Sequence, residues 1–211
     1  RPMPNIRELI NAALSDRRPG DLFARVQAAA HDAATSPYSR DQPTAAQLEA
    51  NSYRTGRVDI QGLPVRIENP RGTRREKPGK FSNLMTSHYG DIAGTCGNDG
   101  DPVDVFIGPF PELPVLYVVN QCGREGDFDE HKVCIGYASE ADARAAYLSA
   151  YAPGWDGLES IVRATVTQLK WWLKFGDKSR PFTSDVLPYE GQTTMDKVLW
   201  NPQAEPVTKP I

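Results

Sequence analysis

Two segments near the N-terminus carry apolar residues at the three- and four-residue spacing of an amphipathic helix. Residues 5–15 and 21–34 both show this spacing, and a Pro-Gly turn signal at residues 19–20 separates them. The pattern predicts a helical hairpin. The polar, proline-containing stretch at residues 36–43 predicts a linker, and Thr44 begins a short predicted helix that ends near Ser52.

From residue 58 the apolar positions alternate with polar ones, which is the period of a half-buried β-strand. Residues 58–60 and 63–67 alternate on either side of Gln61 and Gly62, so a β-hairpin is predicted there. Further strands are predicted at residues 103–107, 115–120 and 132–137, each bounded by Gly, Pro or Asp. The sheet is therefore expected to have about five strands, mostly antiparallel.

Two helices follow the predicted sheet. Ser139 and Asp142 form a predicted capping box for a helix that runs to about Tyr151, and residues 165–175 make a second helix that ends at Gly176. The chain beyond Ser179 is proline-rich. We expect an α+β fold in three parts: a helical accessory region and linker (1–57), a sheet domain (58–178) and a C-terminal extension (179–211).

Composition narrows the functional classes. The 211 residues are 39% hydrophobic, enough for one sizeable core, and the net charge of −3 gives no global reason to expect nucleic-acid binding. The three cysteines show no CxxC spacing, which suggests neither a disulfide framework nor a zinc cluster and makes a reducing, cytoplasmic setting the default. No apolar run is long enough for a membrane span, so a soluble protein is expected. The initial Arg suggests a piece of a longer polypeptide.

The candidate chemistry lies in residues 99–104, where Asp99, Asp101 and Asp104 place three carboxylates within six residues. Like charges this close repel unless cations neutralise them, and carboxylates select hard cations such as Mg²⁺ or Mn²⁺. A solvated turn is the alternative interpretation. An EF-hand is excluded because Phe110 stands where the twelfth-position Glu is needed, and a haloacid-dehalogenase nucleophile would directly follow an apolar strand.

The longer string Tyr89-Gly90-Asp91-Ile92, followed by Asp99-Gly100-Asp101-Pro102-Val103-Asp104-Val105, resembles the signature of the family I soluble inorganic pyrophosphatases. Ile67-Glu68 with Pro70 resembles an early strand of that family. Lys77, and the pair Glu130 and Lys132, also fall in the order that the family shows. The resemblance covers roughly residues 58–175 and extends to pyrophosphatase-like domains within large proteins of phages and mobile elements.

This resemblance implies a small, five-stranded, OB-like β-barrel and the Mg²⁺-dependent hydrolysis of pyrophosphate, with Mn²⁺ as an alternative metal. It implies that Asp99, Asp104 and Glu130 hold a metal pair, that Glu68 assists an outer metal, and that Asp101 takes the proton of the attacking water beside those metals. It further implies phosphate binding by the cationic and hydroxyl side chains Lys77, Lys132 and Tyr89, with Lys80, Arg74, Arg75 and Lys174 as further candidates.

Three departures from the family pattern keep other functions open. The segment between Glu68 and Tyr89 is short, so that Gly79 stands where a second Glu is expected. A further metal-binding Asp has three candidate counterparts, Asn120, Asp127 and Asp129, and Lys174 lacks a neighbouring Tyr. The alternatives are a hydrolase of nucleotides or other phosphoanhydrides, and a catalytically impaired structural or interaction module. Pyrophosphate is the expected partner, and both a monomer and a homo-oligomer remain open.

Overall fold

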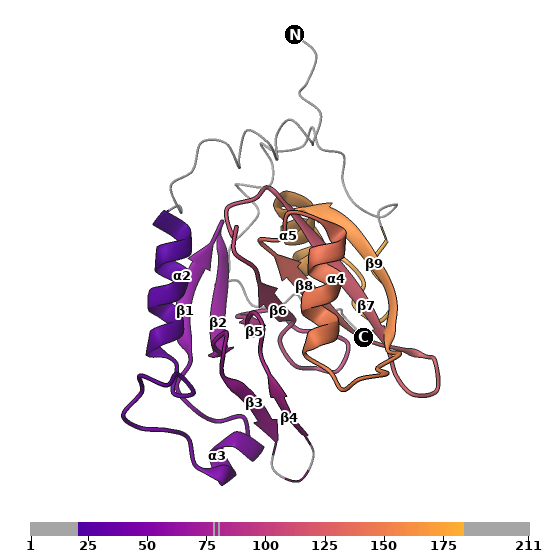
Figure 1. Ribbon diagram of the computed structural model, residues 1–211. Helices are drawn as coiled ribbons and strands as arrows, with labels where there is room; N and C mark the ends of the chain where they lie inside the picture. Colours follow the sequence, from indigo (N-terminus) through magenta and orange to yellow (C-terminus); the bar gives the residue numbers. More distant parts are fainter. Residues whose placement is uncertain (1–20, 78, 80, 184–211) are drawn as a thin grey trace, which may run out of the picture.

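The computed structural model describes residues 21–77, 79 and 81–183, and the predicted helix at residues 5–15 lies outside them. The described chain is a mixed α+β structure of one seven-stranded sheet, one two-stranded sheet and four helices (Figure 1). The helices are α2 (Asp21–Asp32), α3 (Ala45–Glu49), α4 (Glu140–Ser149) and α5 (Val166–Phe175). None of the helices in this part of the chain is long and apolar enough to cross a membrane.

The large sheet has the strand order β1-β2-β5-β6-β8-β7-β9. Its strands are β1 (Gly56–Ile60), β2 (Leu63–Asn69), β5 (His88–Ile92), β6 (Asp104–Ile107), β7 (Val115–Cys122), β8 (Phe128–Ile135) and β9 (Leu158–Thr165). Strands β6 and β8 pair in parallel, and the other neighbours pair antiparallel. The small sheet is the hairpin of β3 (Arg74–Lys77) and β4 (Phe81–Leu84).

The sequence prediction of a mostly antiparallel α+β fold is confirmed, whereas the closed five-stranded barrel is not what the structure shows. The seven-stranded sheet is open, with β1 and β9 as its two edges. The pattern missed β5, which lies inside the stretch interpreted as a motif. It also missed β9, whose positions do not alternate cleanly between buried and exposed. Both missed strands extend the sheet beyond the number that the alternation predicted.

Local signals explain the element ends that the sequence did predict. Thr165 caps α5 in a reciprocal pair of hydrogen bonds with Gln168, and Ser139 accepts a hydrogen bond from the amide of Asp142 at the start of α4. Gln61 and Gly62 both have positive φ, 54° and 83°, as a two-residue hairpin turn between β1 and β2 requires. The two caps therefore set the first residues of α4 and α5, and the turn sets the end of β1 and the start of β2.

The sheet is covered on both faces, which is why β7 is buried along nearly its whole length. One face packs against α2 and α5 through residues such as Val26, Leu169 and Trp172. The opposite face packs against α4 through Ala143, Ala146 and Tyr147. In Figure 1, α4 crosses one side of the sheet and α5 lies behind it. Alternate residues along each strand therefore face two different environments.

Two segments outside the central sheet are tied to it. Phe182 is fully buried, and Asn120 on β7 holds its backbone by donating to its carbonyl at 2.9 Å and accepting from its amide at 2.7 Å. In the accessory region, α2 packs on β1 and the Thr35 hydroxyl donates to the Glu68 carbonyl. The division of the chain at residues 57 and 178 stays a prediction.

Candidate functional site

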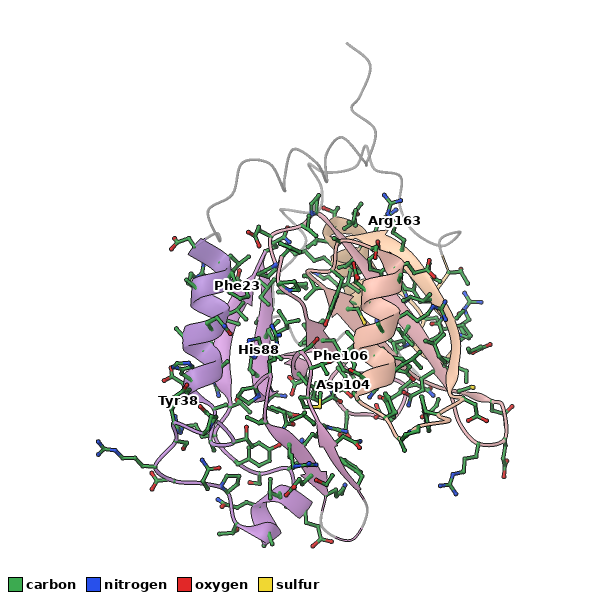
Figure 2. All side chains as sticks on the ribbon, viewed as in Figure 1. Phe23, Tyr38, His88, Asp104, Phe106 and Arg163 are labelled. Carbon is green, nitrogen blue, oxygen red and sulfur yellow. The ribbon has the colours of Figure 1, made fainter. Side chains whose placement is uncertain are left out.

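Strand alternation gathers most of the predicted site residues on the face of the sheet that α4 covers. Asp104 lies two residues before Phe106, and Lys132 two residues before Cys134, and both Phe106 and Cys134 belong to the core beneath α4. Figure 2 shows Asp104 beside Phe106 in the middle of the molecule. The site therefore occupies the end of this face at which β6 begins.

The loop between β5 and β6 carries the other two acidic residues. Its tight turn is closed by a hydrogen bond from the Gly97 amide to the Asp101 carbonyl, at 2.6 Å, and the Asp99 carboxylate accepts from the Asp101 amide at 3.1 Å. Gly100 at the tip has a φ of 88°, a conformation that residues with a Cβ avoid. This geometry leaves the Asp99 and Asp101 side chains exposed at the rim of the site.

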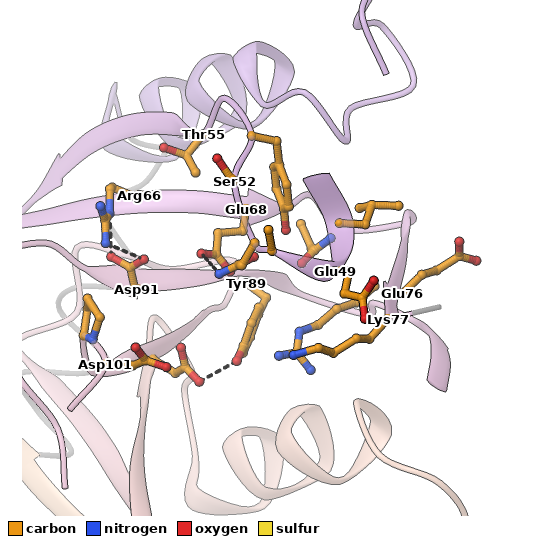
Figure 3. Close-up of a pocket in the computed structure, with 18 of the residues that line it drawn as sticks. Glu49, Ser52, Thr55, Arg66, Glu68, Glu76, Lys77, Tyr89, Asp91 and Asp101 are labelled. Carbon is orange, nitrogen blue, oxygen red and sulfur yellow. Dashed lines mark hydrogen bonds and ion pairs between the residues drawn. The ribbon is translucent and has the colours of Figure 1, made fainter. Parts of the chain in front are cut away.

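A cavity of about 840 Å³ unites these elements. Its lining includes all five acidic residues predicted for the metal site and four of the candidate phosphate-binding residues, namely Glu68, Asp99, Asp101, Asp104, Glu130, Arg75, Lys77, Tyr89 and Lys132. Residues 48–55, which comprise the end of α3 and the segment after it, form another part of the wall. Figure 3 shows Tyr89 near the centre of this pocket, with Asp101 on one side and Glu76 and Lys77 on the other.

At the floor of the pocket, Lys132 joins two carboxylates. Its ammonium group contacts the Asp104 carboxylate and lies 2.7 Å from Glu130 Oε2, and the Tyr89 hydroxyl donates to the same Asp104 oxygen at 2.5 Å. Burial lowers the pKa of Lys132, but Tyr89 and Asp104 outweigh it, so the net pKa lies well above the usual value for a lysine. Lys132 is therefore a fixed positive charge.

The hairpin of β3 and β4 brings a second cation, Arg75, to the pocket. Its guanidinium carbon lies 4.9 Å from the centre of the Phe81 ring and 4.6 Å from that of Tyr89, within the range of cation–π contacts. Burial lowers the pKa of Arg75, but Tyr89 and Asp104 shift it upward overall. Lys77, two residues further along β3, lines the same pocket. The short hairpin thus supplies two cations on one face.

Sequence reasoning missed a pair of oppositely charged residues in this pocket, Arg66 and Asp91. Two nitrogens of Arg66 donate to the two Asp91 oxygens at 2.8 and 2.9 Å, and Figure 3 shows the pair at one side of the pocket. The two residues are direct cross-strand partners on β2 and β5. Their opposite charges would have predicted the contact if β5 had been recognised.

Glu68 is a deeply buried acid of the pocket, with 9% of its surface exposed. Its Oε1 accepts a hydrogen bond of 3.2 Å from Asn51, which follows α3. Burial, together with the charges of Asp104 and Asp91, raises the pKa of Glu68 to about 7. Without a cation beside it, Glu68 is therefore close to half protonated at neutral pH.

Several candidates are not brought to the pocket. Lys174 lies on α5, where its ammonium group is 5.5 Å from the centre of the Phe175 ring, and Lys80 lies outside the described residues. Asn120 points to the opposite face of the sheet and holds Phe182, whereas Asp129 accepts a hydrogen bond of 3.1 Å from Gln121. Asp127, Asp129 and Arg74 do not line the cavity.

The histidines also lie outside the pocket. His88 accepts a hydrogen bond from the Arg71 amide at 3.0 Å and lies 2.5 Å from Gln27 Oε1. His131 faces the other side of the sheet from Lys132 and contacts the Trp172 ring, as the alternation along β8 predicts. The acidic residues of the pocket therefore have no imidazole beside them.

The donor chemistry of the pocket fits a hard divalent cation, because its acids offer only carboxylate oxygens. In the part of the chain that the structure describes, no three His, Cys, Asp or Glu side chains converge closely enough to hold a metal ion. Between Asp104 and Glu130 the positive charge is the ammonium group of Lys132. A metal bound there would share these carboxylates with Lys132.

Carboxylates that face guanidinium and ammonium groups across one cavity are typical of proteins that bind phosphate groups together with cations. The model of the inorganic pyrophosphatase family matches residues 45–174, more than half of the chain, and the chain therefore belongs to that family. The resemblance that the motifs predicted is thus confirmed. Neither the curated proteins nor the solved structures include a significant match to the chain.

Proposed function

We propose that this family member hydrolyses inorganic pyrophosphate to two phosphates, with Mg²⁺ as its cofactor and Mn²⁺ as an alternative. One observation carries the proposal: the five acidic residues predicted for the metal site line a single pocket together with the cations Arg75, Lys77 and Lys132, in a chain of the inorganic pyrophosphatase family. Such a pocket suits a small and highly charged substrate.

Charge neutralisation is the main demand of this reaction. Pyrophosphate repels an attacking hydroxide unless positive groups cancel its charge. Metal ions held in the pocket would supply part of that charge and would lower the pKa of the attacking water. We assign Asp99, Asp104 and Glu130 to hold these ions, with Glu68 beside them.

Asp101 is the proposed general base. It lies in the loop between β5 and β6, its side chain is exposed, and it lines the pocket between the assigned ligands Asp99 and Asp104. A carboxylate suffices as the base when the pKa of the water is already lowered. Asp101 would accept the proton of the attacking water and release it to solvent at the rim.

Lys132, Arg75 and Lys77 are proposed to bind the phosphate oxygens. Arg75 replaces Lys174 in this role, because it lines the pocket and both aromatic contacts hold its guanidinium in place. Lys132 contacts both Asp104 and Glu130, which are two of the assigned metal ligands. A phosphate group bound to those metals would therefore lie near its ammonium group. The Tyr89 hydroxyl, which donates to the Asp104 oxygen that Lys132 also contacts, is a neutral hydrogen-bonding group beside these cations.

The test is phosphate release from pyrophosphate by the purified chain, with Mg²⁺ or Mn²⁺ and after chelation. Asp101→Asn should lower turnover by at least about a hundredfold while the fold is retained, since a general base contributes roughly that factor. Asp127→Asn, an exposed acid on the turn between β7 and β8, serves as the matched control and should keep full activity. Failure to release phosphate with either metal would refute the proposal and favour an impaired module.

A second candidate substrate is a larger phosphoanhydride such as a nucleoside triphosphate. The cavity is lined by the acidic cluster and also by residues 48–55. These residues add polar side chains, such as Ser52 and Tyr53, that a substrate larger than pyrophosphate could contact. Comparing phosphate release from pyrophosphate and from nucleoside triphosphates separates the two. A much better rate with the triphosphate would overturn pyrophosphate as the substrate.

A further inference from the structure

A buried glutamine behind the pocket makes an unusually complete set of hydrogen bonds. Gln121 on β7 is 4% exposed and does not line the cavity. Its Oε1 accepts hydrogen bonds from the hydroxyls of Tyr147 and Tyr151, both at 2.8 Å. Its Nε2 donates to Asp129 Oδ2 at 3.1 Å and to Glu130 Oε1 at 2.9 Å. All four hydrogen-bonding positions of this amide are used.

The direction of these hydrogen bonds is fixed by their chemistry. The Trp155 indole can only donate, and it donates to the Tyr147 hydroxyl at 2.9 Å, so the hydroxyl proton of Tyr147 is directed to Gln121. The carboxylates of Asp129 and Glu130 accept in their ionised form, so they select the NH₂ group of Gln121. A flipped amide would place its oxygen against two carboxylates.

The consequence for Glu130 is a defined orientation. Its Oε1 is held by Gln121, whereas its Oε2 lies 2.7 Å from the Lys132 ammonium group. Glu130 is one-fifth exposed, so without Gln121 its side chain could rotate and give both oxygens to Lys132. Gln121 therefore keeps one oxygen of this acid away from Lys132 and holds the carboxylate at the pocket wall in a single orientation.

We propose that Gln121 is a positioning residue that holds Glu130 for cation binding, and that Tyr147 on α4 holds Gln121 in turn. This inference rests on the proposed role of Glu130 as a metal ligand. It adds a residue that neither touches the substrate nor lines the pocket. The same hydrogen bonds connect α4, which covers this face of the sheet, to Glu130 on β8.

The test measures Mn²⁺ binding directly, by titration calorimetry or electron paramagnetic resonance, so that its outcome does not depend on turnover. Gln121→Met keeps the length of the side chain and removes every hydrogen bond. It should weaken Mn²⁺ binding by about tenfold to a hundredfold, the usual range for the loss of a residue that orients a metal ligand. Tyr147→Phe keeps the packing and should weaken binding by a smaller factor.

The matched control is Gln61→Met. Gln61 also donates from its NH₂ group to two oxygens, the carbonyls of Pro111 and Leu113 at 2.9 and 2.8 Å, but it lies outside the pocket. This variant should lose stability and keep its Mn²⁺ affinity. Equal Mn²⁺ affinity in Gln121→Met, Tyr147→Phe and the parent chain would overturn the inference while leaving the proposed function intact. Absence of Mn²⁺ binding by the parent chain would overturn both.

Discussion

Lys132 is the residue whose loss should reveal most about the pocket. In Lys132→Met the side chain keeps its length and loses its charge, so that Asp104 and Glu130 are left facing each other without a cation between them. Lys132 is 5% exposed, and its two partners are 21% and 20% exposed, so the contact is largely shielded from water. We expect the variant to fold with a reduced free energy of unfolding.

The size of that loss follows from the burial. Removing one partner of a buried ion pair costs roughly 3–5 kcal/mol, and the partial exposure of both carboxylates favours the lower end, about 3 kcal/mol. For a protein of this length, that loss corresponds to a fall of about 6–12 °C in Tm. Urea unfolding followed by circular dichroism, in buffer with a chelator, measures it.

Mg²⁺ should reverse part of this effect. If the carboxylates hold a divalent cation, Mg²⁺ stabilises the Lys132→Met variant more than the parent chain, because the cation replaces a missing charge only in the variant. Lys77→Met removes a positive charge that has no ion pair with a described residue, and it should change the stability by less than about 0.5 kcal/mol. If Lys132→Met were as stable as the parent in chelator, or gained nothing extra from Mg²⁺, the reasoning would be refuted.

Two further predictions concern pH. The raised pKa of Glu68, about 7, means that the folded chain keeps a proton which the unfolded chain loses near pH 4.5, so stability falls as the pH rises between these values. Glu68→Gln should therefore be more stable than the parent by up to about 3 kcal/mol at about pH 8 in chelator, and less active. Burial, with the charges of Arg71 and His31, lowers the pKa of His88 to about 4. Stability should fall as the pH drops from about 6.5 to about 4, and His88→Gln should reduce that dependence, which contributes up to about 3 kcal/mol.

A matched variant at an exposed position controls the first experiment. Glu159→Gln changes an exposed side chain of the same type as Glu68 and should leave the pH dependence of unfolding as it is in the parent. A Glu68→Gln variant less stable than the parent at about pH 8 in chelator would contradict the first prediction. An unchanged acid slope in His88→Gln would contradict the second.

The sequence predicted the parts of the site that depend on neighbouring residues. Asp99, Asp101 and Asp104 form a cluster because they are close along the chain, and the opposite orientation of His131 and Lys132 follows from the two-residue period of a strand. The caps of α4 and α5 were predictable for the same reason, since Ser139 and Thr165 each bond to a residue three positions on. These features depend on residues that are close together in the sequence, so the sequence alone is enough to predict them.

The remainder depends on contacts between distant segments. The parallel pairing of β6 with β8 brings Asp104 opposite Lys132, and it cannot be read from either strand alone. Arg75 reaches the pocket through the aromatic rings of Phe81 and Tyr89, which requires the hairpin to fold back toward β5. Lys174 was selected by its late position in the chain, yet it lies on α5, the helix that packs against the face of the sheet opposite the site.

The alternation along β8 has a consequence for folding. A shift of β8 by one residue would turn His131 toward the pocket and press Glu130 and Lys132 against the apolar layer that contains Trp172 and Phe182. Burying two charges in that layer without their partners costs several kcal/mol each. The charged residues therefore penalise the wrong strand register, so the same side chains that form the pocket also select the one pairing of β6 and β8 in which the pocket exists.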